Sequence, residues 1–280
     1  MTEDQEDEPF EVCIIDADSL IYQIAYTTVS PALAKKALDK TINSIVETVI
    51  ADSVHVFIKG RDNFRFKADP LYKANRVATI EPEIKDRIDK LYVYAREICV
   101  EGHMGEADDY CAIVASECAE EGRSYIVAHI DKDLDCIPGY HYNFKKQTFY
   151  EMTDHDAYRW VIKQLLTGDA TDNIKGLKGI GTKRADNMLA DVPNSMLLDL
   201  ATEAYGISGR DDFIKTANCI MMRTSLEDLR PFNYAEILER LEWKKKPDTG
   251  LPLQTDPILP LDSCMQFSDQ PEDSILAVSN

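Results

Sequence analysis

Short apolar runs and longer amphipathic stretches alternate along the first half of the chain. Three apolar runs have the length and the branched side chains of buried strands, and they lie at Glu11–Asp16, Val54–Ile58 and Ser124–Ile130. Helical spacing of apolar residues predicts helices between and around them: one from Ser19, and others over 32–51, 81–98 and 106–120. This alternation predicts an α/β fold with a largely parallel sheet.

The pattern changes after the third predicted strand. A short hairpin is expected at Tyr142–Tyr150, and a helix from Asp154 to about Leu166. Residues 169–191 are rich in Gly, Lys and Asp, and they predict two short helices joined by a glycine-rich turn. Further helices are expected to about Trp243. The tail, rich in Pro, Asp and Ser, is expected to be disordered.

The net charge of −19 argues at first against nucleic acid as a partner. The charge is unevenly distributed, however. Residues 1–8 carry five acidic side chains, residues 247–280 carry six and no Lys or Arg, and nine more lie in four short motifs. The rest of the chain is close to neutral and has local basic runs, which can bind phosphate even in an acidic protein.

Other features narrow the class of protein. No apolar run approaches the roughly 20 residues that span a bilayer, and the acidic N-terminus is unlike a signal peptide, so a cytoplasmic protein without a membrane partner is expected. The seven cysteines form no C-x-x-C pair and are expected to be reduced and mostly buried. The five histidines, including His129, are interpreted as structural or surface residues, which leaves no His/Cys set typical of zinc.

Four groups of acids have the spacing of a functional site. They are Asp16-x-Asp18, Glu106-x-Asp108-Asp109, Asp131-x-Asp133 and Asp169-x-x-Asp172. Acids two apart at a strand end point to one side, and acids three apart share a face of a helix. Each motif alone fits equally well as caps and turns. All four together favour a carboxylate cluster, which like-charge repulsion makes costly without cations. Mg²⁺ or Mn²⁺ suits these oxygens, and two such ions about 4 Å apart form the usual clamp for phosphodiester cleavage.

Two basic segments are candidates for binding phosphate. On a helix, Lys73 and Arg76 would share a face and could grip one phosphate, while Tyr72 could stack on a terminal base. Spacing alone favours a solvated basic face at these positions. In residues 176–185, Gly179 and Gly181 form a turn that opens a helix, where backbone N–H groups can face an anion. Its basic side chains are Lys178, Lys183 and Arg184. An ordinary glycine-rich connection is the alternative.

Together these segments resemble the family of 5′-3′ exonucleases and flap endonucleases, which includes bacteriophage 5′-exonucleases and the 5′-nuclease domain of bacterial DNA polymerase I. The matching segments are I-I-D-A-D-S-L, N-F-R with Y-K-A-N-R, G-E-A-D-D-Y, D-K-D-L-D and G-D-A-T-D-N-I-K-G-L-K-G-I-G-T-K-R-A. They follow the family's order from residue 12 to about 190, and the last segment is highly specific. Because the chain has no polymerase part, the resemblance implies a stand-alone, phage-type enzyme of DNA replication.

The resemblance implies a PIN-like nuclease core over 10–166 with a helical arch at about 60–100. It also implies a helix–hairpin–helix-like DNA-binding domain over 167–245, which usually binds K⁺, and it leaves 1–9 and 246–280 as disordered acidic ends. Carried over by position, the implied metal ligands are Asp16, Glu106, Asp108, Asp109, Asp131, Asp133, Asp169 and Asp172. Lys73 and Arg76 become catalytic residues that contact the scissile phosphate, with Tyr72 stacking beside them and Arg65 as another phosphate contact.

One departure from the family concerns the second strand, which commonly ends in V-F-D. Here Val56 and Phe57 are followed by Ile58 and Lys59. Asp62 could substitute only if the loop folds back, and Asp18 could compensate.

The expected function is that of a two-metal-ion 5′-3′ exonuclease or structure-specific 5′ flap endonuclease that leaves 5′-phosphates. Its expected partner is duplex DNA with a free or flapped 5′ end, or an RNA–DNA hybrid, bound by a monomer. Two alternatives stay open. Without the second-strand acid, the chain could be a catalytically weak protein that binds branched DNA. It could also be a PIN-type single-strand ribonuclease, although the duplex grip at 176–185 argues against that.

Overall fold

The computed structural model describes residues 9–76 and 80–242, all of which belong to one compact unit, Met1–Pro247. The acidic ends that were expected to be disordered, 1–9 and 246–280, lie outside the described residues except for Pro9. None of the helices in the described part is long and apolar enough to cross a membrane.

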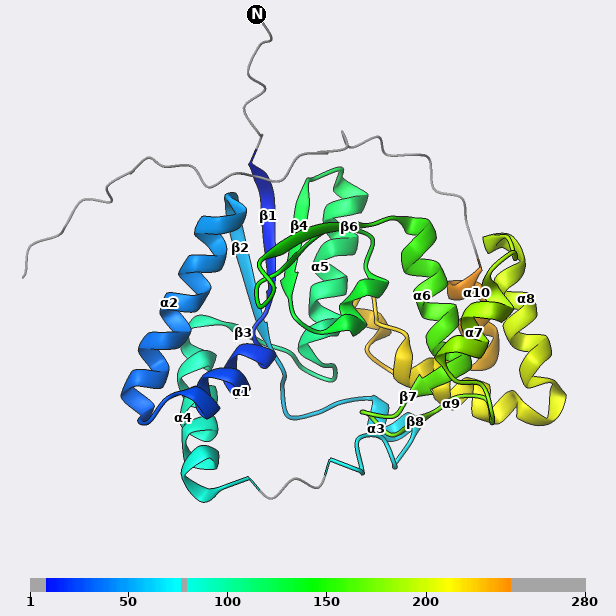
Figure 1. The fold of residues 1–280 in the computed structure, drawn as a ribbon, viewed down its shortest axis with the longest axis horizontal. Coiled ribbons are helices and arrows are strands. Elements are labelled where there is room, and N and C mark those ends of the chain that lie inside the picture. The colour runs from blue at the N-terminus through cyan, green and yellow to red at the C-terminus, as the bar shows by residue number, and fades with distance from the viewer. Residues whose placement is uncertain (1–8, 77–79, 243–280) are drawn as a thin grey trace, which may run out of the picture. The chain divides into compact units, whose positions relative to one another are not determined.

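A six-stranded sheet lies at the centre of the first half of the chain (Figure 1). Its strands, in spatial order, are β3 (Val100–Glu101), β2 (Ala51–Ile58), β1 (Phe10–Asp16), β4 (Tyr125–His129), β5 (Gly139–Asn143) and β6 (Thr148–Met152). All neighbours are parallel except β5 and β6, which form an antiparallel hairpin. The predicted parallel sheet is confirmed, whereas the two-residue β3 is too short to leave a hydrophobic pattern.

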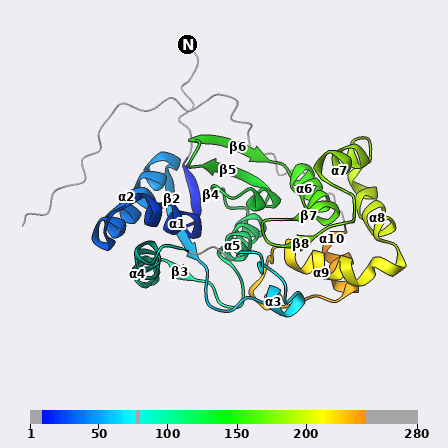
Figure 2. The same ribbon diagram turned by 60° about the horizontal axis from the view of Figure 1, so that its bottom comes forward.

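Helices cover both faces of this sheet (Figures 1 and 2). On one face, α1 (Asp18–Thr27), α2 (Pro31–Val49) and α4 (Pro82–Ile98) pack in a core that includes Cys13 and Ile15 of β1. On the other face, α5 (Ala107–Glu121) packs against Val12 and Ile14 of the same strand. Alternate residues of a strand point to opposite faces, so β1 is buried on both sides and reads as a continuous apolar run.

Local signals set the ends of two helices in this part of the chain. At the start of α5, Glu106 and Asp109 form a capping box, and Gly122, with a φ of +70°, ends the helix. Both ends agree with the predicted ones. At the end of α2, Ile50 adopts a left-handed conformation with a φ of +49°, so β2 begins at Ala51, three residues before its predicted start.

The remaining helices pack around a second core, to one side of the sheet (Figure 2). They are α6 (Asp154–Thr167), α7 (Thr182–Leu189), α8 (Asn194–Tyr205), α9 (Arg210–Ile220) and α10 (Tyr234–Leu241), with short 3-10 turns η2 (Ile207–Gly209) and η3 (Leu226–Asp228) between them. Leu165 of α6 belongs to this second core. The sequence analysis placed α6 in the nuclease core, and α6 contacts β6 of that part as well as α7, α8 and α9 of the helices that follow it.

A small hairpin replaces the first of the two helices predicted within 169–191. Its strands are β7 (Gly168–Asp169) and β8 (Ile174–Lys175). Gly168 permits it, because its φ is +66° and a Cβ there would lie 2.3 Å from the Ile174 carbonyl oxygen. The second predicted helix is α7, which follows the glycine-rich turn as expected.

The segment expected to arch over the site has two parts. From the end of β2 the chain runs to the one-turn helix α3 (Arg65–Ala68), which contacts α9, and the turn after α3 is hydrogen-bonded to the β7–β8 hairpin (Figure 1). Helix α4 places Ile88, Leu91 and Ala95 in the first core. The turn after α3 therefore borders the hairpin. Helix α4 instead belongs to the helical layer that covers one face of the sheet.

Candidate active site

Acidic side chains gather at the carboxyl edge of the sheet, where β1 and β4 lie side by side. Asp16 ends β1, and Asp131 follows β4 and caps the 3-10 helix η1 (Lys132–Cys136), which carries Asp133. The chain passes through β2 and β3 between these two strands, so the strand order reverses at this point. Such a reversal opens a crevice at the carboxyl ends of parallel strands, which is the usual place for a ligand.

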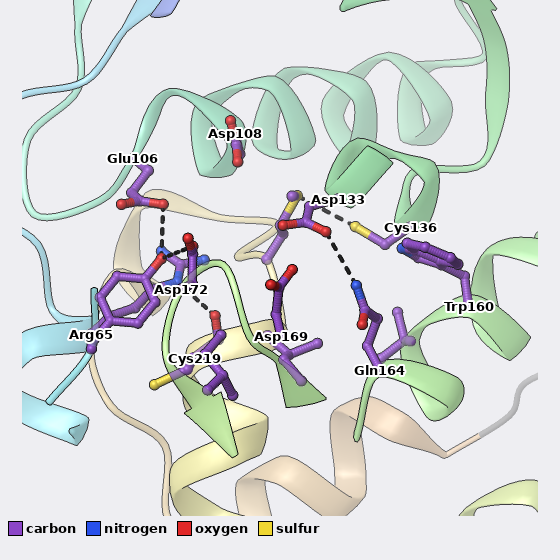
Figure 3. Close-up of a pocket in the computed structure, with 15 residues that line it drawn as sticks. Arg65, Glu106, Asp108, Asp133, Cys136, Trp160, Gln164, Asp169, Asp172 and Cys219 are labelled. Atoms are coloured by element: carbon purple, nitrogen blue, oxygen red, sulfur yellow. Dashed lines mark hydrogen bonds between the residues drawn. The ribbon is translucent and has the colours of Figure 1, made fainter. Parts of the chain in front are cut away.

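Two other elements bring their acids to the same place. Glu106 and Asp108 lie at the start of α5, and Asp169 and Asp172 belong to the β7–β8 hairpin. Together with Asp133, these four acids line a single pocket, and in Figure 3 the carboxylates of Asp133 and Asp169 turn toward the same space. The sequence analysis expected Asp169 and Asp172 on one face of a helix. The hairpin brings them to the predicted cluster instead.

Burial and neighbouring carboxylates raise the pKa of several of these acids. Burial, Asp18 and Asp131 raise the pKa of Asp16 to about 7. Burial and Asp131 likewise raise the pKa of Asp133 to about 6, and burial with Asp16 raises that of Asp108 well above its usual range. These shifts indicate carboxylates that converge without enough positive charge. The all-oxygen donor set and this excess of negative charge fit hard divalent cations such as Mg²⁺.

Ionisation of Asp16 and Asp133 should cost the metal-free protein stability as the pH rises from about 4 to about 7, against an opposing gain from the buried His129 and His141, whose pKa values burial lowers to about 4. The folded pKa values of Asp16 and Asp133, about 7 and 6, lie above the usual 3.8. Their contribution to the free energy of unfolding is therefore fully present below the pKa that these groups have in the unfolded state. It is lost as the pH rises through their pKa values in the folded state. Urea unfolding in EDTA at several pH values measures this loss. Asp16→Asn should flatten the profile and the exposed-site control Asp89→Asn should not; an unchanged Asp16→Asn profile would contradict the raised pKa.

Basic side chains neutralise three other acids of the pocket. Lys73 pairs with Glu106 at 2.5 Å and lies 3.4 Å from Asp172, which also pairs with Arg76. Burial by itself would raise the pKa of Glu106, but Lys73 and Arg65 outweigh it and lower the pKa. Lys73 and Arg76, which were predicted to contact the scissile phosphate, therefore lie beside acids of the pocket.

Lys132 has the same effect on Asp169. Its Nζ lies 3.1 Å from Asp169 Oδ2. Burial opposes ionisation of Asp169, but the hydrogen bond from Lys132 and that from the Thr171 backbone N–H outweigh it and lower the pKa.

The turn that carries Tyr72, Lys73 and Arg76 is not the helix that their spacing could have formed. Lys73 has a φ of +55°, and its backbone N–H donates to the Asp172 carbonyl at 2.7 Å. The Tyr72 ring is only 3% exposed, and its hydroxyl lies 3.1 Å from both Glu106 Oε2 and Asp172 Oδ2. The sequence analysis expected Tyr72 to stack on a base. In this structure the ring is buried, and its hydroxyl links two acids instead.

Asp109 and Arg65 differ most from their predicted roles. They form a buried ion pair, with exposed fractions of 0% and 3% and N–O distances of 2.5 and 2.9 Å. The other hydrogen bonds to the Asp109 carboxylate come from the backbone N–H groups of Glu106 and Arg223. Asp109, predicted as a metal ligand, thus has both oxygens engaged by protein donors, and Arg65, predicted as a phosphate contact, is committed to Asp109.

The second strand ends in Ile58 and is followed by Lys59, where the family pattern V-F-D has an acid, and Lys59 contacts Asp18. Asp18 accepts a hydrogen bond from the Lys59 backbone N–H and another from the Tyr92 hydroxyl, both at 3.0 Å, and it lies 3.4 Å from Lys59 Nζ. Asp62 is exposed. Asp18 therefore compensates the charge of Lys59.

The glycine-rich turn before α7 presents its whole basic set to solvent. The five DNA-binding residues predicted within this turn are all exposed: Lys178, Gly179, Gly181, Lys183 and Arg184. Gly179 has a φ of +80°, a conformation that favours glycine, although a Cβ there would touch nothing. The turn and the open N-terminus of α7 form a surface suited to phosphate.

A second group of side chains with atoms that could ligate a metal lies beside the acidic pocket. His129 of β4, His141 of β5 and Asp135 of η1 place one ligand atom each within 4.8 Å of one another. The sequence analysis interpreted these histidines as structural. His141 pairs in register with Val127, two residues before His129, so the grouping depends on β4 and β5 being neighbours.

The comparisons with known proteins agree with the motifs. No family model matches the chain. The thermostable DNA polymerase I of Thermus thermophilus is 30% identical over 201 residues, which cover 64% of this chain and 24% of the polymerase. The exonuclease of Escherichia phage T7 is 31% identical over 121 residues, which cover 42% of this chain and 40% of the exonuclease. The chain thus spans about a quarter of the polymerase.

Solved structures show the fold. The D15 protein of phage T5, co-crystallised with metal ions, superposes with a TM-score of 0.61 at 16% identity, over 82% of this chain and 97% of that one. A complex of T5 D15 flap endonuclease with DNA and metal ions gives a TM-score of 0.60 at 18% identity, over 83% of this chain and 99% of that one. The chain has the fold of a phage 5′-nuclease. Its homologues are DNA polymerase I and phage exonucleases, which confirms the resemblance that the motifs carried.

Proposed function

We propose that this protein is a metal-dependent 5′ nuclease that hydrolyses phosphodiester bonds of DNA near a free or flapped 5′ end. The observation that carries the proposal is one pocket in which five carboxylates from three elements meet, with Lys73 and Arg76 beside them. Homology to phage exonucleases and the shared fold support it. An RNA–DNA hybrid is a further expected substrate, and the chain is expected to act as a monomer.

The proposed ligands of two Mg²⁺ ions, which Mn²⁺ could replace, are Asp16, Glu106, Asp108, Asp131, Asp133, Asp169 and Asp172. When bound, such ions neutralise the phosphate and lower the pKa of the attacking water. Asp109 and Arg65 are given a different role. Their ion pair fixes the first turn of α5, and so it positions Glu106 and Asp108.

Lys73 and Arg76 would stabilise the negative charge that develops on the scissile phosphate. Lys73 is about one fifth exposed and Arg76 is half exposed, so both can reach a substrate at the mouth of the pocket. In the metal-free protein they pair with Glu106 and Asp172. Cations that bind these acids would release the two basic side chains toward a phosphate.

Lys73→Ala should slow the chemical step by about 100-fold or more, because it removes a cation from the reacting phosphate. DNA affinity should change by only about threefold, since Lys73 is one of several phosphate contacts. Single-turnover cleavage and fluorescence anisotropy measure the two effects separately. Lys67→Ala, at an exposed position on α3, is the control and should change neither. Equal losses in rate and affinity would make Lys73 a docking residue instead.

We further propose that the turn at 176–185 grips the backbone of the duplex, with K⁺ as a possible ion at its carbonyl groups. The exposed Lys183 and Arg184 would contact phosphates without reading bases.

Lys183→Ala should weaken DNA binding and reduce the slope of log affinity against log salt by about 1, because one phosphate contact is lost. The cleavage rate at saturating DNA should stay unchanged, since the turn does not line the acidic pocket. Binding titrations at several salt concentrations provide the measurement, with the exposed Lys40→Ala as control. A salt slope identical to that of the wild type would remove Lys183 from the interface.

The proposed function is tested by incubating a 5′-flap duplex with the protein in Mg²⁺, in Mn²⁺ and in EDTA. Metal-dependent release of products is expected, and the product ladder separates stepwise trimming from flap excision. The second strand ends in Ile58 where the family pattern has an acid, and this favours the alternative of a catalytically weak branched-DNA-binding protein. Binding without cleavage in either metal would establish that rival. Cleavage of single-stranded RNA in preference to the duplex would favour a PIN-type ribonuclease.

A further inference from the structure

Two buried histidines face each other beside the acidic pocket. His129 and His141 are 1% and 0% exposed, and His129 Nε2 lies 2.7 Å from His141 Nδ1. Tyr150 lies next to them, with its hydroxyl 3.1 Å from His129 Nε2 and 2.7 Å from Asp135 Oδ1. Neither histidine nor Asp135 lines the acidic pocket described above.

In each ring, the nitrogen that faces away from the other histidine contacts a backbone carbonyl oxygen, and this contact determines which nitrogen carries the proton. His129 Nδ1 is 2.6 Å from the Asp131 carbonyl oxygen, and His141 Nε2 is 2.9 Å from the Ile137 carbonyl oxygen. A carbonyl oxygen can only accept a hydrogen bond, so each of these nitrogens carries the proton of its neutral ring. His129 Nε2 and His141 Nδ1 are then both left with a lone pair and no proton. Two lone pairs that face each other at this distance repel, so a positive charge is required between them.

We infer that a transition-metal ion, for which Zn²⁺ fits the donors best, binds between His129 Nε2, His141 Nδ1 and the Asp135 carboxylate. Two neutral imidazoles and a carboxylate are a common zinc donor set. The outer N–H groups, which donate to backbone carbonyls, are the usual support of metal-bound histidines. Zn–N bonds of about 2.0–2.1 Å at a tetrahedral angle separate two nitrogens by about 3.3 Å, so the rings must part by about 0.6 Å.

A proton shared by the two rings is the other way to supply the charge. Burial, followed by the neighbouring His129, lowers the pKa of His141 to about 4, which disfavours a second proton at neutral pH. A metal ion has no such limit, because it binds the neutral rings. Asp135 is only partly buried and also borders a second, open pocket with Arg159 and Trp160.

The site would serve as a structural staple. Asp135 belongs to η1, which also carries Asp133, while His129 and His141 belong to β4 and β5. An ion at this place would tie η1 to the sheet and thereby hold Asp133 and its neighbour Asp131 in position. The sequence analysis found no zinc set because these residues are spread over three elements.

The test measures zinc that magnesium cannot displace. Untagged protein is loaded with Zn²⁺ and dialysed against excess Mg²⁺, which clears the oxygen-only pocket, and the retained zinc is quantified by mass spectrometry. The wild type should keep about one ion per chain. So should Asp133→Asn, in the acidic pocket, and His155→Ala, at an exposed histidine. His141→Ala should lose the ion, with an affinity lower by about 100-fold or more. X-ray absorption at the zinc edge should show two imidazole ligands.

A milder variant guards against a folding defect. Asp135→Asn keeps an acceptor for Tyr150 but removes the carboxylate, so the circular dichroism spectrum should be unchanged. Zn²⁺ should raise the melting temperature of the wild type more than Mg²⁺ does, and this difference should vanish in Asp135→Asn. No zinc retained by the wild type, or equal retention by His141→Ala, would overturn the inference. Because neither readout depends on cleavage, the result is separate from that of the flap assay.

Discussion

Asp133→Ala should abolish cleavage of a 5′-flap duplex, with a loss of about 1000-fold or more, while the duplex stays bound. Asp133 lines the acidic pocket, and Asp131, Asp169 and Asp172 all act on its pKa. Removing its carboxylate weakens the hold on a divalent cation where charge must be neutralised, and the exposed turn before α7 does not line this pocket. Single-turnover cleavage in Mg²⁺ measures the loss, and anisotropy in Ca²⁺ measures binding.

A milder substitution at the same position, Asp133→Asn, separates lost activity from lost stability. Burial raises the pKa of Asp133 to about 6, so its ionised form is unfavourable in the metal-free protein. Asp133→Asn should therefore be at least as stable as the wild type in EDTA at pH 7.5, and a lost activity would not reflect unfolding. Asp89→Asn, an exposed acid of α4, should keep full activity. Cleavage by Asp133→Ala at the wild-type rate would remove Asp133 from the site.

Asp109→Ala should differ from the Asp133 variants, because it should cause a large loss of stability that does not depend on metal. It leaves the Arg65 guanidinium buried without its partner, which costs about 3–5 kcal/mol. For a protein of this size the melting temperature should fall by about 6–20 °C. Urea unfolding in EDTA measures the effect, because no divalent cation then contributes.

Two comparisons isolate the ion pair. The double variant Arg65→Met/Asp109→Leu removes both charges and should recover much of the lost stability. Asp89→Ala breaks an exposed pair with Lys85 and should leave the melting temperature almost unchanged. A metal ligand would behave differently, since Asp109→Ala would then keep its stability in EDTA and lose Mg²⁺ affinity. That outcome would restore the role that the sequence predicted for Asp109.

Features that depend on neighbouring residues were predictable from the sequence. The apolar run that ends in Asp16 forms a buried strand, and α5 runs from a capping box at Glu106 to Gly122. Parallel strands share one carboxyl edge, so the meeting of Asp16 and Asp131 followed from the strand–helix alternation alone. In each case the determining residues are close together in the sequence, and the physical signal is periodicity or capping.

Only the tertiary structure decided which of the candidate residues face the pocket and which face each other. Arg65 meets Asp109 across 44 positions, and the Tyr72 hydroxyl meets Asp172 across 100. His129 and His141 meet because β4 and β5 are neighbours in the sheet. Such pairings depend on strand order and burial, which determine whether a charged side chain finds an opposite charge, another acid or solvent. The sequence therefore specified the elements and the edge at which the acids gather, and packing over long sequence distances assigned each side chain its partner.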